Sequence, residues 1–127
     1  MSTFDYRKDA SGIYFPVVDV TTYHAGNFIK TPALIDSGAT ISVFRPEVAN
    51  QLNVDINKGK RIFLRGIAGR IEGYIHKLPV SIAGKQFTCP IVFSNEHLTS
   101  FNLLGRENFF KQFTISFEEK HQRVKLL

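Results

Sequence analysis

A single acidic residue directly follows a short apolar run in the first third of the chain. The run is Ala33-Leu34-Ile35, and Asp36-Ser37-Gly38-Ala39-Thr40 follows it at once. A carboxylate at the end of a buried strand is costly unless it is hydrogen-bonded or takes part in chemistry. Gly38 allows a tight turn and lets backbone N–H groups approach the carboxylate. The segment therefore predicts either an ordinary turn after a strand or a functional acid held at a strand end.

The composition favours a small protein built mainly from strands. The chain has 127 residues, 12 of them Phe and 4 Tyr, and glycines recur along its length. Aromatic and β-branched residues are typical of strands, and this length is typical of one domain. We expect an N-terminal segment over residues 1–12 and one domain over residues 13–127. Hydrophobic residues make up 43% and charged residues 21%, which excludes a disordered or collagen-like chain.

Turn and breaker residues divide the chain into short hairpins. His24-Ala25-Gly26-Asn27 has the composition of a tight turn, so residues 13–23 and 28–35 are predicted to be strands. Pro46 suits the first position of a helix over residues 46–52. A glycine-rich hairpin is predicted from residues 61–64 and 74–78, and a second hairpin from residues 78–82 and 86–93. A second helix is predicted over residues 107–112, and a terminal strand pair from residues 113–117 and 123–127.

One local pattern occurs twice in the sequence. Ala25-Gly26 is followed by Pro32, six residues after the glycine, and Ala83-Gly84 is followed by Pro90 at the same spacing. The two copies are offset by 58 residues. We interpret this pattern as an internal two-fold, in which two related strand–turn–strand–helix halves share one domain.

Three elements in a fixed order resemble the retropepsin-like (retroviral-type) aspartic proteases of clan AA. Leu34-Ile35-Asp36-Ser37-Gly38-Ala39-Thr40 matches the family's apolar pair followed by Asp-Thr/Ser-Gly-Ala. Leu103-Leu104-Gly105-Arg106 is similar to the second signature, an apolar pair followed by Gly-Arg at the start of a helix. The glycine-rich residues 66–73 lie between them, where the family has a flap hairpin. The resemblance covers about residues 13–117.

The resemblance implies a fold and a set of site residues. The fold would be mostly β, a single-domain acid protease of closed, barrel-like hairpins with a flap and one or two short helices. The implied residues are the catalytic Asp36, the active-site loop residues Ser37, Gly38, Ala39 and Thr40, the flap and substrate-binding residues Gly66, Ile67, Ala68 and Gly69, the substrate-wall residues Phe101 and Leu103, and the structural residues Gly105 and Arg106.

The sequence departs from retroviral members in several places, among them the flap, which lacks the double-glycine pairs of retroviral flaps. Thr40 stands where those enzymes usually have an acid that pairs with the helix arginine, so Arg106 needs another partner. The predicted C-terminal strand pair looks closer to the end of a pepsin-type lobe than to interleaved viral termini. The dimer interface is therefore expected to differ from the viral one.

Peptide hydrolysis by this chemistry needs two carboxylates about one water apart, one acting as general base and the other as general acid. The chain has one Asp-Ser/Thr-Gly, so the second carboxylate must come from another molecule. The simplest arrangement is a homodimer with Asp36 of both subunits on a two-fold axis. A peptide or protein would be the substrate, and no cofactor is needed.

Two other classes of function stay open. Because a fold does not guarantee its chemistry, the chain could be a non-proteolytic retropepsin-like module that dimerises and binds a peptide. The formal net charge of +5 allows a nucleic-acid binder, but no known binding motif accompanies the charge, so nucleic acid is not the expected partner.

The remaining residues and segments point to structure rather than chemistry. Cys89 is predicted to be a small buried residue, and the four histidines lack metal-type spacing, so no metal is expected. The first residues lack the apolar run of a secretory signal, and no run approaches the ~20 residues that cross a bilayer. We therefore expect a cytoplasmic protein without membrane contact. A stripe of aromatic residues is predicted to lie in the core, namely Phe109, Phe110, Phe113 and Phe117.

Overall fold

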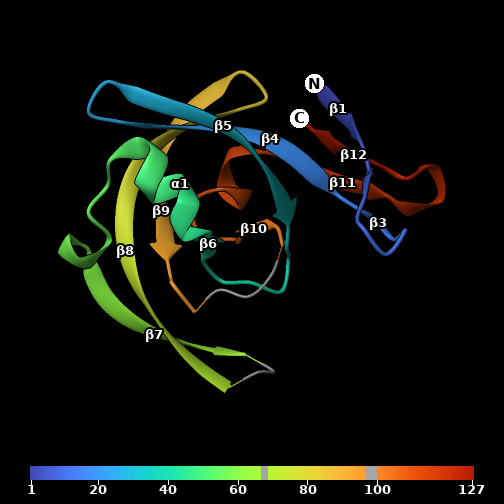
Figure 1. The fold of residues 1–127 in the computed structure, drawn as a ribbon. Helices are drawn as coiled ribbons and strands as arrows, with labels where there is room; N and C mark the ends of the chain where they lie inside the picture. Colours follow the sequence, from blue (N-terminus) through green and yellow to red (C-terminus); the bar gives the residue numbers. More distant parts are fainter. Residues whose placement is uncertain (67–68, 97–99) are drawn as a thin grey trace.

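The protein is mostly β, with one short α-helix, in the computed structural model (Figure 1). The structure describes residues 1–66, 69–96 and 100–127. Within these ranges, no helix is long and apolar enough to cross a membrane. The elements are, in chain order, β1 (Ser2–Asp5), β2 (Arg7–Lys8), β3 (Tyr14–Phe15), β4 (Val17–His24), β5 (Asn27–Ile35), β6 (Ser42–Phe44), α1 (Pro46–Leu52), the 3-10 helix η1 (Ile56–Lys58), β7 (Lys60–Gly66), β8 (Gly69–Ile82), β9 (Lys85–Phe93), β10 (Asn102–Leu104), η2 (Phe110–Gln112), β11 (Ile115–Glu118), η3 (Glu119–His121) and β12 (Arg123–Leu126).

Seven strands form the main sheet, in the order β4-β5-β10-β6-β9-β8-β7. A further pairing of β4 with β8 joins the two sides of this sheet, so six of its strands close into a barrel and β7 extends beyond them. The strand predicted over residues 13–23 is divided at Pro16, because β3 pairs with β2 while β4 pairs with β5. Proline lacks the N–H that a continuous ladder would need at that position.

Both predicted hairpins of the internal repeat are confirmed. Ala25 and Gly26 join β4 to β5, and Ala83 and Gly84 join β8 to β9. All four residues have positive φ, at 47°, 83°, 51° and 80°. Positive φ at both central residues is the requirement of the two-residue turn that matches the twist of paired strands. The repeated Ala-Gly therefore encodes the same turn twice.

The pairing registers show that the repeat is a structural two-fold. In the first half, Leu34 of β5 lies opposite Leu103 of β10 in a parallel pair. In the second half, Val92 of β9 lies opposite Val43 of β6, also in a parallel pair. Leu34 and Val92 are separated by the same number of residues as the two Ala-Gly turns, so they occupy equivalent positions of the two halves. Each half thus receives its third strand from the other half.

The antiparallel contacts between the halves obey the same symmetry. Thr22 of β4 lies opposite Val80 of β8, and Val43 of β6 lies opposite Leu103 of β10. Each pair joins equivalent positions of the two halves, as contacts across a two-fold axis must. The internal two-fold predicted from the sequence is confirmed by these registers.

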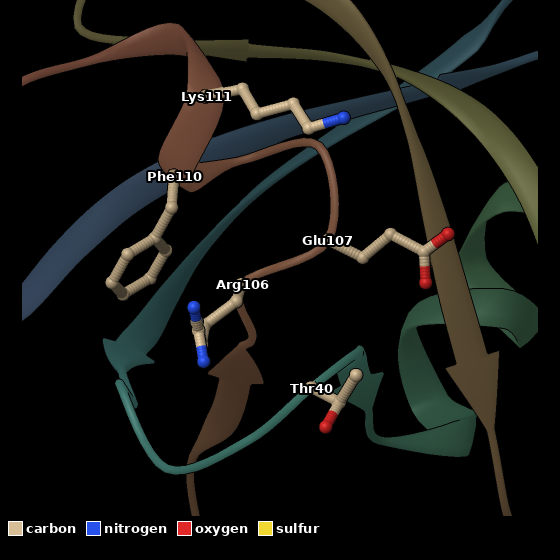
Figure 2. Close-up of a pocket in the computed structure, with 5 residues that line it drawn as sticks. All are labelled: Thr40, Arg106, Glu107, Phe110 and Lys111. Atoms are coloured by element: carbon tan, nitrogen blue, oxygen red, sulfur yellow. The ribbon is translucent and has the colours of Figure 1, made fainter.

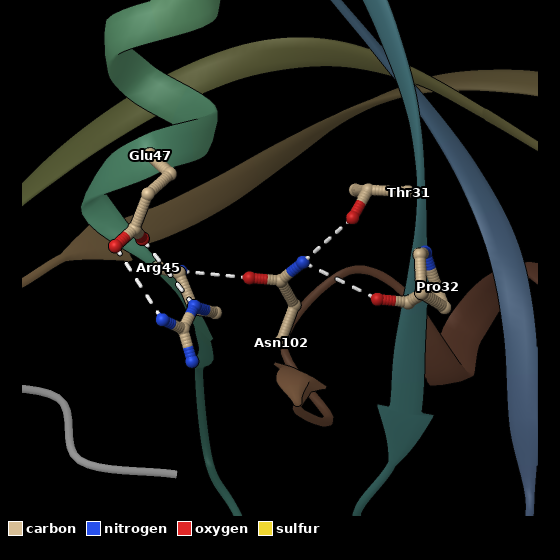
Figure 3. A network of polar contacts seen from close by, with 5 residues as sticks. All are labelled: Thr31, Pro32, Arg45, Glu47 and Asn102. Carbon is tan, nitrogen blue, oxygen red and sulfur yellow. Dashed lines mark hydrogen bonds and ion pairs between the residues drawn. The ribbon is translucent and has the colours of Figure 1, made fainter. Parts of the chain in front are cut away.

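Buried polar side chains join each third strand to the opposite half. The backbone N–H of Gly105, which follows β10, donates to Ser42 Oγ of β6 at 3.0 Å. In the symmetric position, the backbone N–H of Arg45, which follows β6, donates to Asn102 Oδ1 of β10 at 2.7 Å (Figure 3). Ser42 and Asn102 are both buried, so these bonds form away from water.

Asn102 also holds β10 against β5. Its amide Nδ2 donates to Thr31 Oγ1 at 2.9 Å and to the carbonyl oxygen of Pro32 at 3.2 Å, as Figure 3 shows. In the other half, Ser42 Oγ lies 3.8 Å from Cys89 Sγ, and Cys89 occupies the position equivalent to Thr31. The polar link is therefore present in both halves, with a weaker sulfur partner in the second.

The helix predicted over residues 46–52 is confirmed as α1. Pro46 begins it, and Asn53 ends it in the left-handed conformation, with φ at 58°. Val48, Ala49 and Leu52 are buried and belong to the barrel core. The helix therefore seals the end of the barrel near β5 and β6 (Figure 1).

The second helix predicted over residues 107–112 is wrong. This stretch is a turn followed by the single 3-10 turn η2, because Asn108 has a φ of 58° and interrupts the right-handed conformation. Phe109 is fully buried and contacts both Phe110 and Phe113, as the predicted aromatic stripe requires. Phe117 does not belong to the core, since 42% of its surface is exposed on β11.

The two ends of the chain form a separate three-stranded sheet, β1-β12-β11. The predicted C-terminal strand pair is present as β11 and β12, with η3 between them. β12 also pairs with β1, so Ser2–Asp5 is fixed against the end of the chain. The N- and C-termini consequently lie close together in Figure 1.

We expect Asn102→Ala to destabilise the fold by about 2–4 kcal/mol, because it removes three hydrogen bonds and leaves the Arg45 N–H without its acceptor. Urea unfolding followed by circular dichroism measures the loss. Asn57→Ala, at an exposed position of η1, is the matched control and should change the unfolding free energy by less than about 0.5 kcal/mol. Equal stabilities of the two variants would contradict the structural role of Asn102.

Candidate active site

Asp36 directly follows β5 and is held by the backbone of the second repeat. Its N–H donates to the carbonyl oxygen of Leu104 at 3.0 Å, which continues the parallel pairing of β5 with β10. The N–H of Gly38 donates to Asp36 Oδ1 at 2.9 Å, and the N–H of Ala39 donates to the Asp36 carbonyl at 3.2 Å. These bonds fix the carboxylate at the strand end while leaving Asp36 only half-buried.

The loop after Asp36 is open to solvent. Ser37, Gly38 and Thr40 are exposed, and Ala39 is half-buried. A Cβ on Gly38 would lie 3.3 Å from Asp36 Oδ1, so glycine gives the carboxylate room for a second group to approach. The loop is therefore rigid at its base and accessible at its tip.

The internal two-fold identifies the residue equivalent to Asp36 as Ser94. Ser94 makes the same local bond, because the N–H of Glu96, two residues on, donates to Ser94 Oγ at 3.1 Å. The Ser94 hydroxyl in turn donates to the carbonyl oxygen of Glu72 at 2.6 Å. The second half thus keeps the turn of the first half and replaces its acid with an alcohol.

Gly105 fits against the chain that follows Asp36. A Cβ at this position would overlap the backbone of Ile41, so no other residue fits. The next N–H groups bind the same loop, from Arg106 to the carbonyl of Ala39 at 2.9 Å and from Glu107 to the carbonyl of Thr40 at 2.8 Å. These contacts bring residues 105–107 against the Asp36 loop, two segments that the sequence analysis placed in one site.

Arg106 is exposed and makes no ion pair within the described part of the chain. Its guanidinium lies below the ring of Phe110 in Figure 2, and Thr40 lies on the opposite wall of the same cavity. A threonine cannot supply the missing charge. The structure therefore leaves the positive charge of Arg106 available to a group outside this chain.

One face of the main sheet carries an apolar row that ends near Asp36. The registers place Leu34, Leu103, Val43, Val92 and Ile75 side by side across β5, β10, β6, β9 and β8. Side chains alternate along a strand, so all five lie on the face opposite the barrel core. Leu34 and Leu103 are only partly buried. They form an apolar wall on the side toward which Asp36 also projects by alternation from Leu34.

The glycine-rich hairpin is present as β7 and β8, paired up to Gly66 and Gly69. Ile67 and Ala68, expected at the flap tip, lie outside the described residues. By the same alternation, Ile62, Leu64 and Ile71 lie on the face of the apolar row, and all three are half-buried. The hairpin extends from the barrel toward the lower edge of Figure 1, as does the loop after β5.

The opposite face of this hairpin is charged. Arg61 lies 5.0 Å and Arg70 3.7 Å from the centre of the Phe63 ring, and Arg61 also pairs with Glu72 at 3.0 Å. Cation–π contacts of this kind join the two strands across their outer surface. The hairpin therefore has one polar, cross-linked face and one apolar face.

Phe101 and Leu103, the expected wall residues, differ in their surroundings. Leu103 belongs to the apolar row described above. Phe101 precedes β10, and its ring packs edge-on against Phe15 with the centroids 5.8 Å apart. Both are half-buried, and alternation places them on the same face. The sequence did not indicate that Leu34, Val43, Ile62, Leu64 and Ile71 share this face, because only the strand registers show which face each side chain takes.

Cys89 is buried, as the sequence predicts. Burial raises the pKa of its thiol to about 11, so it is protonated at neutral pH and unsuited to act as a nucleophile. Across residues 1–66, 69–96 and 100–127, no three side chains of the His, Cys, Asp and Glu types gather in a way that could hold a metal ion.

The comparison with protein-family models places the chain in a known class. The aspartyl protease family model matches residues 20–107, from within β4 to the turn after β10. Because the match covers more than half of the chain, the protein belongs to the aspartyl protease family. The family match supports a hydrolase that acts on peptide bonds. A comparison with curated proteins gave no match.

We expect Gly105→Ala to destabilise the protein by about 3 kcal/mol or more, because the added methyl group overlaps the Ile41 backbone and must push the Asp36 loop away. Gly38→Ala is the control, since its methyl group would meet only the Asp36 side chain. Thermal unfolding of both variants measures the difference. A Gly105→Ala protein as stable as Gly38→Ala would rule out the close approach of the two segments.

Proposed function

We propose that the protein is an aspartic endopeptidase whose active site forms between two copies of the chain, with Asp36 supplied by each. The observation that carries this proposal is the pair Asp36 and Ser94. Equivalent positions of the internal two-fold hold one carboxylate and one alcohol, so the chain by itself has half of a two-carboxylate site. The exposed loop at Ser37 and Gly38 supports a second copy at this point.

In the dimer, the two Asp36 carboxylates would share one proton, because two like charges at such close range cannot both ionise. The ionised carboxylate takes a proton from a water molecule, and that water attacks the carbonyl carbon of the scissile bond. The protonated carboxylate donates its proton to the carbonyl oxygen. The resulting tetrahedral intermediate collapses by breaking the C–N bond. The carboxylate that took the proton from water passes it to the leaving nitrogen, and a hydroxyl of the intermediate returns its proton to the other carboxylate. The Gly38 N–H, at 2.9 Å from Asp36 Oδ1, keeps the carboxylate oriented.

The apolar row and the flap hairpin would enclose the substrate. Leu34 and Leu103 supply the floor, and the apolar face of the hairpin, with Ile62, Leu64 and Ile71, supplies the cover. Closure of such a cover excludes water from the site. The apolar surface formed by these residues fits best a peptide that has bulky apolar side chains on either side of the scissile bond.

The change Asp36→Asn should abolish cleavage of a peptide library, with kcat/KM lowered at least about 10³-fold, while leaving the dimer intact. The amide is nearly isosteric with the carboxylate but cannot act as a base. Peptide cleavage is followed by mass spectrometry, and the dimer by sedimentation. Cleavage that survives the substitution, or a wild-type protein that cleaves nothing between acidic and neutral pH, would favour the non-proteolytic peptide-binding module instead.

Mixing the wild-type chain with Asp36→Asn tests the origin of the second carboxylate. In an equal mixture, random pairing gives two intact acids in only about a quarter of the dimers, so each wild-type chain loses about half of its activity. Activity unaffected by the inactive chain would mean that one subunit suffices. The control is an equal mixture of the wild-type chain with Lys58→Gln, a change at an exposed position. This mixture should keep the full activity of the wild-type chain.

A further inference from the structure

A cavity of about 510 Å³ adjoins the loop that carries Asp36 (Figure 2). A second cavity of about 330 Å³ shares Glu107 and Lys111 with it, and we call the two together the basic pocket. The basic pocket is lined by Thr40, Lys77, Thr88, Pro90, Arg106, Glu107, Asn108, Phe110 and Lys111.

The basic pocket carries an excess of positive charge. Arg106, Lys111 and Lys77 are its cations, and Glu107 is its single acid. None of the three cations makes an ion pair with another described residue. Figure 2 shows the Glu107 carboxylate pointing away from the Arg106 guanidinium. Among the described residues that line the basic pocket, the cations therefore outnumber the acid.

The walls of the basic pocket are held in place by backbone bonds. Arg106 and Glu107 are bound to the Asp36 loop, as described above, and the Phe110 N–H donates to the Arg106 carbonyl at 3.2 Å. The Asn108 side-chain amide donates to the carbonyl oxygen of Thr88 on β9. The backbone of this segment is therefore held in place before a ligand enters, so the main chain needs little reordering on binding.

The basic pocket also continues the face of the sheet that carries the apolar row. Ile75 lies opposite Val92 in that row, and two residues further along the same strands Lys77 lies opposite Pro90. Alternation places both pairs on one face. Lys77 therefore lies on the same face of the sheet as the apolar row.

We propose that the basic pocket binds an acidic side chain of the substrate, at a residue beyond the two that flank the scissile bond. This proposal rests on the proposed function and adds a substrate class to it, peptides with an apolar cleavage site and an Asp or Glu nearby. Arg106 and Lys111 supply the positive charge that attracts the carboxylate, and the Phe110 ring, which lies near the Arg106 guanidinium in Figure 2, offers an apolar surface to its methylene groups.

The test uses peptides that differ by a single Glu or Gln at each position around an apolar cleavage site. We expect the wild-type protein to prefer Glu by about tenfold in kcat/KM at one position. Lys111→Gln and Lys77→Gln should each reduce that preference, measured as the ratio of kcat/KM for the Glu peptide to kcat/KM for the Gln peptide. Lys58→Gln removes the same charge from an exposed position outside the basic pocket and should keep the preference.

A binding measurement separates this proposal from the proposed function. The Asp36→Asn protein should bind the Glu peptide about tenfold more tightly than the Gln peptide in fluorescence anisotropy, whether or not the wild-type protein cleaves either. Absence of cleavage with this binding difference intact would overturn the proposed function alone. Equal binding of the two peptides, or a Glu preference that persists in Lys111→Gln and Lys77→Gln, would overturn the role of the basic pocket.

Discussion

The exchange of third strands between the two halves of the barrel is the constraint on which the rest of the structure depends. β10 pairs in parallel with β5 and β6 pairs in parallel with β9, so neither half can form its sheet without the other. Parallel pairing requires a long connection between the paired strands, and here the opposite half supplies it. The buried side chains of Ser42 and Asn102 stabilise both exchanges. Ser42 accepts from the Gly105 N–H, directly after β10, and Asn102 accepts from the Arg45 N–H, directly after β6.

The same exchange builds the candidate site. The carbonyl of Leu104 receives the Asp36 N–H, and the next residue, Gly105, lies against Ile41. The carboxylate therefore stands where a strand of one half meets the returning strand of the other. The Gly38 N–H and the Leu104 carbonyl hold Asp36 from its two sides. A fixed, half-buried acid beside an exposed loop tip therefore follows from the topology rather than from any single bond.

Turns, helix ends and the burial of single residues could be predicted from residue type and local spacing. The Ala-Gly turns, the helix beginning at Pro46 and the burial of Cys89 followed from residue type and spacing. The helix after Gly105 did not form because Asn108 adopts positive φ, a conformation that asparagine tolerates but does not signal. The sequence did not show that Leu34 and Val43 lie side by side in the apolar row, because this placement depends on the registers between distant strands. The Asp36 motif was recognisable because its acid, hydroxyl and glycine are consecutive.

The internal two-fold explains why one chain is insufficient for the proposed chemistry. Its axis passes between Val43 and Leu103, and it relates Asp36 to Ser94, whose hydroxyl accepts from the Glu96 N–H and donates to the Glu72 carbonyl. A carboxylate in place of Ser94 would face that carbonyl oxygen with a negative charge and no proton to donate, so the fold selects an alcohol there. The second acid must then come from outside, at the exposed end of the Asp36 loop. A two-fold symmetric dimer is the simplest arrangement that supplies it, because the Asp36 loop of each chain then contacts the Asp36 loop of its partner.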